Sequence, residues 1–144
     1  MKDLVAVLAL LLGASAAQAQ TVPDLKGTWI GKGKTVVFGT GAHHPGEPSD
    51  PDTPRVHDFE FTVVITHQEG SLAWGYASSR VADTREPIAL AVASDGKTVI
   101  GSDTNGSLHM TVVSADRMEN CYTHTGLGPG KSIVANCAMF DRKK

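Results

Sequence analysis

Histidine and acidic side chains, which can bind metal ions or move protons, gather in one stretch of this sequence. The chain contains six histidines, and His43, His44 and His57 lie in or beside a proline-rich segment, residues 39–58. Imidazole and carboxylate groups ligate Zn²⁺ and Cu²⁺. The ligands of a structural site are held by rigid elements, whereas the regular proline spacing here is typical of extended chain. We favour a solvated loop and keep the three histidines as candidate metal ligands.

A second set of polar side chains lies in the last two predicted strands. Tyr122, His124 and Asn136 share one face of that hairpin, together with Asn120. If this face is the inner one, its phenol, imidazole and amide groups form a cup that can bind a small molecule by hydrogen bonds. If it is the outer one, the same groups form an ordinary solvated surface. The sequence leaves both alternatives open.

Apolar residues that could complete such a cup occur in other strands. Trp74 and Tyr76 alternate along one strand, and we predict that they contact a ligand as part of an apolar wall. Phe61, Ile65 and Met110 would extend this wall. The alternative role for all five is packing in the core without contact with a ligand.

Catalysis is not predicted. The sequence has no G-x-S-x-G, H-E-x-x-H or phosphate-binding glycine motif. His57 and Asp58 are adjacent in sequence, so in a strand their side chains point to opposite faces. We therefore predict a non-catalytic protein without a cofactor.

The hydrophobic pattern indicates an all-β chain. Apolar residues at helical spacing are absent after the N-terminal segment, whereas short runs rich in β-branched and aromatic residues recur. Turn sequences such as Asp95-Gly96 and Asn105-Gly106 separate them. The eight predicted strands are Gly27–Phe38, Phe59–Gln68, Leu72–Ser78, Ile88–Ala93, Thr98–Ser102, Ser107–Ser114, Met118–Thr125 and Ser132–Arg142.

Most connections between these strands are short, which makes consecutive strands antiparallel neighbours. The fold class is therefore predicted as an eight-stranded antiparallel up-and-down β-barrel, a meander whose closure removes exposed edges. The rival immunoglobulin-like sandwich usually places a tryptophan between two cysteines, whereas both cysteines here follow both tryptophans. The long loop 39–58 is the exception, and it could cover the barrel mouth or bind a partner.

The two cysteines, Cys121 and Cys137, are predicted to form a disulfide. They face each other if the last hairpin is centred on Pro129. A bridge closing a loop of about 15 residues contributes about 3 kcal/mol in the chain-entropy model. A metal pair is the alternative, but two thiolates are too few ligands.

The first 19 residues are predicted to be a secretory signal peptide. Residues 4–12 form an unbroken apolar run, and small residues follow up to Ala17-Gln18-Ala19, which is the layout of a cleaved leader. A buried N-terminal helix is the alternative, because the run is too short to span a bilayer. We expect residues 20–144 to form one barrel domain in a secreted or periplasmic protein.

Charge and hydropathy exclude two classes of partner. The formal net charge is −2, and no basic cluster suited to nucleic acid is present. No apolar run in residues 20–144 is long enough to span a membrane.

The two ends of the predicted meander resemble a known superfamily. Leu25-Lys26-Gly27-Thr28-Trp29 at its start and Phe140-Asp141-Arg142 at its end resemble the calycins, which include lipocalins, fatty-acid-binding proteins and avidins. The resemblance implies that Gly27 and Trp29 form the barrel floor and that Arg142 packs over the Trp29 ring, a cation–π contact. It also implies a ligand-binding cup at the opposite end.

The resemblance does not name a ligand. Residues 27–33 look like the opening of nitrobindin-type haem barrels, but the Pro-Met-His pattern of those proteins is absent. Ile30, Lys32 and Lys34 stand where avidins carry residues that hold biotin.

The predicted function is a secreted or periplasmic, non-catalytic β-barrel that binds a small molecule in its open end. The predicted contact residues are Trp74, Tyr76, Tyr122, His124 and Asn136. The alternative is a secreted protein-binding module or inhibitor that acts through the 39–58 loop or the N-terminal segment.

Overall fold

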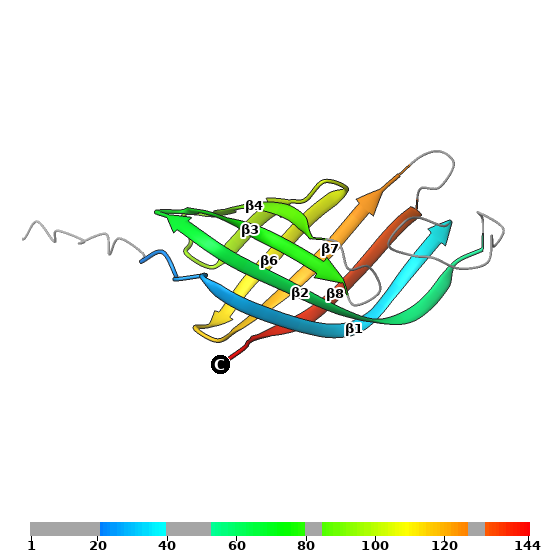
Figure 1. The fold of residues 1–144 in the computed structure, drawn as a ribbon, viewed down its shortest axis with the longest axis horizontal. Helices are drawn as coiled ribbons and strands as arrows, with labels where there is room; N and C mark the ends of the chain where they lie inside the picture. The colour runs from blue at the N-terminus through cyan, green and yellow to red at the C-terminus, as the bar shows by residue number, and fades with distance from the viewer. Residues whose placement is uncertain (1–20, 40–52, 80–84, 127–131) are drawn as a thin grey trace, which may run out of the picture.

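The computed structural model describes residues 21–39, 53–79, 85–126 and 132–144, and these form a closed antiparallel barrel of eight strands in chain order (Figure 1). The predicted fold class is confirmed. The strands are β1 (Gly27–Gly39), β2 (Arg55–Glu69), β3 (Leu72–Ser79), β4 (Glu86–Val92), β5 (Thr98–Ser102), β6 (Gly106–Ser114), β7 (Arg117–Thr125) and β8 (Ser132–Arg142). The predicted signal peptide lies outside the described residues. The described part of the chain holds no helix that could cross a membrane.

Tight turns join the strands at one end of the barrel. In the β4–β5 turn, the Asp95 carboxylate accepts bonds from the Thr98 hydroxyl and from the amides of Thr98 and Lys97 at 2.6–2.9 Å. These bonds, that of the Thr98 hydroxyl first, lower the pKa of Asp95 to about 2. Gly96 follows at φ 64°, a conformation that glycine adopts without strain.

Strand β2 begins earlier than predicted. Residues 55–58 belong to β2 and pair with β1 from Val37↔Arg55 to Lys34↔Asp58, so the predicted loop 39–58 is too long at its C-terminal end. The outward Lys34 and Asp58 bond at 2.8 Å across the two strands. The alternation of inward and outward side chains therefore continues through residues 55–58. The prolines and charges of the sequence predict a loop there.

The closed end of the barrel is filled by an apolar core under a polar cover. Trp29 is 1% exposed, its ring nitrogen donates to the Leu25 carbonyl at 2.9 Å, and Leu25 itself is buried. Arg142 lies over the Trp29 ring at 4.3 Å from its centroid, as the resemblance implies. The guanidinium also donates to the carbonyls of Asp24, Lys26 and Ala115. Gly27, at φ 134°, lies against this guanidinium.

A bulge in β2 secures the segment before the barrel. The β2–β3 register shifts between Ile65 and His67, which turns Gln68 toward the closed end. The Gln68 amide accepts from the Leu25 backbone N–H and donates to the Pro23 carbonyl, both at 2.8 Å. The N-terminal segment is thus packed onto the barrel from residue 23 onward.

The glycines of β1 admit large rings to the interior. A Cβ atom on Gly31 would lie 2.2 Å from the Phe140 ring, and one on Gly33 would lie 3.1 Å from the Phe59 ring. Both distances are shorter than ordinary Cβ contacts, so glycine is required at Gly31 and favoured at Gly33. These two positions therefore allow close packing between β1 and the rings of its neighbouring strands.

The barrel closes by pairing β1 with β8, and this ladder is interrupted. Pairs run from Trp29↔Arg142 to Gly31↔Phe140 and resume from Val36↔Ala135 to Gly39↔Ser132 in the same register. Between them, residues 32–35 of β1 and 136–139 of β8 are not paired with each other. Cys121 and Cys137 bond across β7 and β8 beside this interval, which confirms the predicted disulfide.

Candidate functional site

The inner face of β7 and β8 carries the predicted polar residues. Asn120 is 1% exposed, and Tyr122 and His124 follow it on the same face. Asn136 is paired with Tyr122 and alternates with the buried Val134. The alternative that the sequence left open, an outer solvated surface, therefore does not hold for Tyr122, His124 and Asn136.

The β5–β6 turn places a carboxylate beside this face. Asp103 Oδ1 accepts from the backbone N–H groups of Asn105 at 2.8 Å and Gly106 at 2.6 Å. The Tyr122 hydroxyl donates to the same oxygen at 3.3 Å. The Asn105 side chain in turn donates to Glu86 at 2.9 Å, so both carboxylates at this rim accept hydrogen bonds from the protein.

A chain of hydrogen bonds runs from this carboxylate to Ser132. The Tyr122 hydroxyl lies 3.3 Å from His124 Nδ1, and His124 Nε2 lies 2.9 Å from Ser132 Oγ. An ionised Asp103 can only accept, so the Tyr122 hydroxyl donates to it and accepts from the Nδ1–H of His124. The Nε2 of neutral His124 is then the acceptor for the Ser132 hydroxyl. One direction of donation is consistent with all three bonds of the chain, and it leaves only Asp103 Oδ2 without a partner within the described residues.

Burial keeps the Tyr122 phenol neutral. Its loss of solvent, followed by the nearby negative charge of Asp103, raises the pKa of Tyr122 far above its ordinary value. Tyr122 is therefore a hydrogen-bond donor throughout the physiological pH range.

This shift makes stability depend on alkaline pH. Tyrosine ionises with a pKa of about 10 when the chain is unfolded, but Tyr122 stays neutral at that pH when the chain is folded. The unfolded state therefore loses the proton first, and the free energy of unfolding falls as pH rises above about 10. In a Tyr76→Phe variant, whose only tyrosine is Tyr122, ultraviolet absorbance should show no phenolate until the barrel unfolds. A phenolate signal from folded protein near pH ~10 would contradict this.

The other strands around the open half add both polar and aromatic groups. Thr35 is 2% exposed, and the Asn136 side chain donates to its hydroxyl at 3.4 Å. The Phe61 and Tyr122 rings lie 6.2 Å apart. Polar side chains thus line the open half along β7, β8 and β1, and aromatic rings face them from β2.

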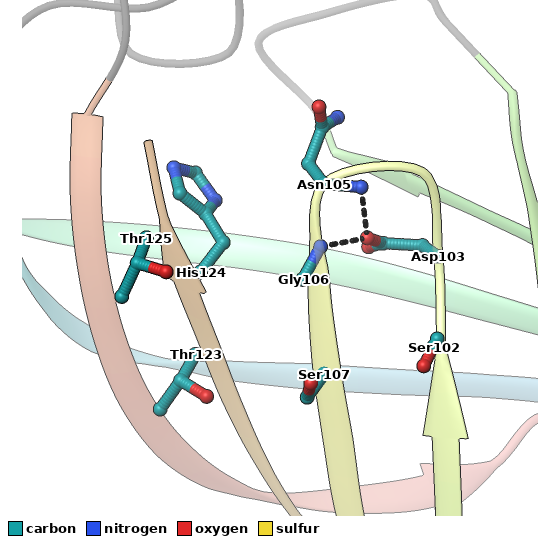
Figure 2. Close-up of a pocket in the computed structure, with 8 residues that line it drawn as sticks. All are labelled: Ser102, Asp103, Asn105, Gly106, Ser107, Thr123, His124 and Thr125. Carbon is teal, nitrogen blue, oxygen red and sulfur yellow. Dashed lines mark hydrogen bonds between the residues drawn. The ribbon is translucent and has the colours of Figure 1, made fainter. Parts of the chain in front are cut away.

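An open hollow of about 310 Å³ adjoins the hydrogen-bonded chain at the rim (Figure 2). Figure 2 shows Asp103 and the β5–β6 turn on one side of it and the end of β7 with His124 on the other. Most of its other lining groups are exposed hydroxyls of Ser102, Ser107, Thr123 and Thr125, which alternate with inward residues and so belong to the outer face of the barrel. The lining residues are Ser102, Asp103, Asn105, Gly106, Ser107, Thr123, His124 and Thr125.

Trp74 and Tyr76 do not lie with these residues, so their predicted place in an inner apolar wall is wrong. Their neighbours Ala73 and Ala77 are buried, and Trp74 is 43% exposed. Trp74 stacks on His67 with ring centroids 5.4 Å apart, and Arg85 lies over the Tyr76 ring. The core on this side is filled by Ile65, Ile88 and Leu90, so β3 presents its small residues inward.

The remaining wall residues do face inward. Ile65 and Met110 belong to the buried core and Phe61 packs against it.

The predicted metal ligands are not brought together in the described part of the chain. His43 and His44 lie outside it. His57 is half-buried on β2 opposite Thr35. Residues 21–39, 53–79, 85–126 and 132–144 contain no group of three potential ligands that could hold a metal ion.

The two predicted protein-binding segments differ in what the structure describes. Most of the 39–58 loop, residues 40–52, lies outside it. The N-terminal segment packs onto the closed end through the two Gln68 bonds.

Two residues of the site, Asp103 and Ser132, were not predicted from the sequence. Asp103 lies in an Asp-x-Asn-Gly turn, which indicates a turn but no contact with Tyr122. Ser132 is the first residue of β8. It lies an even number of residues before Asn136, so the two side chains share one face of the strand, and this spacing could have pointed to Ser132.

No family model matches this chain, and no curated protein and no solved structure matches it either. The chemistry of the site therefore carries the functional argument.

Proposed function

We propose that the protein is a calycin-like barrel that binds a small, uncharged polar molecule in its open end. The observation that carries this proposal is the division of the inner face into two halves. Apolar side chains fill the closed half, whereas Tyr122, His124, Asn136 and Thr35 gather on the inner face of the open half. Such a combination of apolar walls and few convergent polar groups is typical of ligand sites.

The charges of the site favour a neutral ligand. Glu86 accepts a bond from Asn105, and Asp103 accepts three bonds through one oxygen. Arg55 donates to the Gly39 carbonyl at 2.6 Å. Each of these charged groups already makes at least one bond to the protein, so a charged ligand would compete with those bonds. The buried Asp103 Oδ2 and Arg55 Nε have no partner within the described part of the chain, and they can accept from or donate to a neutral polar ligand. Hydroxyl and amide groups can instead join the existing pattern.

We further propose that the protein acts outside the cytoplasm, secreted or periplasmic. The Cys121–Cys137 disulfide is compatible with an oxidising compartment, and the apolar leader at residues 4–12 supports export.

Binding can be tested by NMR titration with a library of neutral, flat molecules that carry hydroxyl or amide groups. We expect backbone amide shifts at Tyr122, His124 and Asn136 and none at Trp29. His124→Ala should weaken binding by about fivefold to tenfold, the worth of one hydrogen bond.

The control is His109→Ala, because His109 is an exposed histidine on the outer face of β6. It should leave the affinity unchanged. Shifts confined to the closed end, or equal effects of the two histidine variants, would contradict the proposal.

A further inference from the structure

Ser132 and His124 have the separation of a nucleophile and its general base. The distance between Ser132 Oγ and His124 Nε2 is 2.9 Å, within the range of about 2.6–3.2 Å for such pairs. The simplest interpretation is a buried serine that satisfies its hydroxyl. Three further features of the surroundings favour a chemical role.

The first feature is the orientation of the imidazole. Tyr122 accepts from Nδ1–H only because its own proton is given to Asp103, and Asp103 is fixed by the amides of Asn105 and Gly106. The tautomer that results directs the Nε2 lone pair toward Ser132. A base oriented by a third group is the arrangement that activates serine in acyl transfer.

The second feature is the lack of side chains on the two backbone neighbours of the serine. Ser132 is paired with Gly39 on β1, and the Gly126 N–H donates to the Ser132 carbonyl at 3.1 Å. Both neighbours of Ser132 across the rim therefore lack side chains. Ser132 itself is 3% exposed, so an ester must enter through the open end to reach it, and only a small acyl group fits the proposal.

The third feature is a guanidinium at the same rim. Arg55 donates from Nη2 to the carbonyl of Gly39, the residue paired with Ser132. Its Nε is buried and has no hydrogen-bond partner within the described part of the chain. A buried donor without a partner is costly, and the negative oxygen formed in acyl transfer would supply the missing acceptor.

We propose that Ser132 is a nucleophile and His124 its general base in the hydrolysis of small carboxylic esters. Ser132 Oγ bonds to the ester carbonyl carbon while its proton passes to His124 Nε2. The carbon–oxygen bond to the leaving alcohol then breaks, and His124 returns the proton to that oxygen. Water attacks the acyl-serine in the same way and releases the carboxylic acid.

In this proposal Arg55 faces the carbonyl oxygen, and Tyr122 and Asp103 are positioning residues. The proposal rests on the proposed function, because the ester must enter the open end, and it adds chemistry to that binding site.

The test uses p-nitrophenyl acetate with the full protein. We expect release of p-nitrophenol together with one acetyl group on the peptide that contains Ser132, detected by mass spectrometry. Ser132→Ala should abolish this acetylation, and His124→Ala should lower its rate by about 100-fold or more. Ser71→Ala and His109→Ala, at exposed positions away from the site, should react like the wild type.

A second variant tests the positioning role. Tyr122→Phe should lower kcat by about tenfold and leave KM unchanged, because the imidazole loses its orientation while the space for the ester remains. A rise in KM with constant kcat would assign Tyr122 to binding alone.

Acetylation that persists in Ser132→Ala, or that occurs only on lysines, would overturn the proposal. Circular dichroism of each variant shows whether the barrel is intact, and loss of reaction counts only in folded variants. The unreactive amide p-nitroacetanilide separates the two proposals. If it shifts the amides of Tyr122 and His124 but the ester does not acetylate Ser132, the inference fails and the proposed binding function stands.

Discussion

Replacing Trp29 with alanine should lower the free energy of unfolding by about 3–5 kcal/mol, the usual cost of removing a large buried ring. Trp29 is 1% exposed and belongs to the core at the closed end. Its loss also leaves the Leu25 carbonyl without the ring N–H donor and Arg142 without the ring that it covers. Denaturant unfolding monitored by circular dichroism gives the change directly.

The second tryptophan provides a matched control. Trp74 has the same chemistry but lies 43% exposed on the outer face, against His67. Trp74→Ala should cost about 1 kcal/mol or less. Equal losses for the two variants would show that the closed end does not depend on Trp29. The same pair should differ in fluorescence, since only Trp74 is in contact with solvent.

Removing the disulfide should lower the free energy of unfolding by about 3 kcal/mol, the value for a closed loop of about 15 residues. The cause is a larger number of conformations in the unfolded chain. The bond lies where β8 has lost its ladder with β1, between the pairs Gly31↔Phe140 and Val36↔Ala135. Residues 136–139 of β8 pair only with β7. Removing the disulfide is therefore expected to loosen these residues as well.

The measurement compares wild type with a Cys121→Ser, Cys137→Ser double variant in denaturant, with and without reductant. Reductant should destabilise the wild type and leave the double variant unchanged. Hydrogen exchange should show the largest loss of protection at residues 136–139 of β8. Equal stability of the two proteins under oxidising conditions would contradict the expected contribution.

The strand order and the disulfide could be predicted because they depend on local signals. Asp95-Gly96 and Asn105-Gly106 mark turns, and short turns make neighbouring strands antiparallel. Once Cys121 and Cys137 lie in one hairpin, their separation in sequence determines their register. Trp29 and Arg142 were placed by the resemblance, since no local rule brings together two ends of a chain.

The direction in which β3 faces could not be predicted in this way. Leu72, Trp74 and Tyr76 are larger than Ala73 and Ala77, and size alone suggests that they point inward. In the structure these larger side chains point outward and the alanines point inward. Ile65, Ile88 and Leu90 from the neighbouring strands fill that side of the core. Which strand provides the large core side chains depends on the packing of the whole barrel and not on one strand's sequence.

The hydrogen-bonded chain of the site was also beyond the sequence. Tyr122 and His124 are two residues apart on β7. Asp103 reaches Tyr122 from the β5–β6 turn, and Ser132 reaches His124 from the neighbouring strand β8. Motif searches look for residues in fixed local order, and these four have none. Only the closed barrel brings them to one rim.

The β1–β8 pairing sets the order in which this barrel can form. Arg142 bonds to the carbonyls of Lys26 and Asp24, which precede it by 116 and 118 residues, whereas β4 to β7 are joined by short turns. Contacts so distant in sequence form slowly, so the hairpins assemble first and the two outermost strands meet last. Until then the curled sheet has two free edges, at β1 and β8, able to pair with another chain. Aggregation during refolding should therefore depend on how long the nascent barrel stays open.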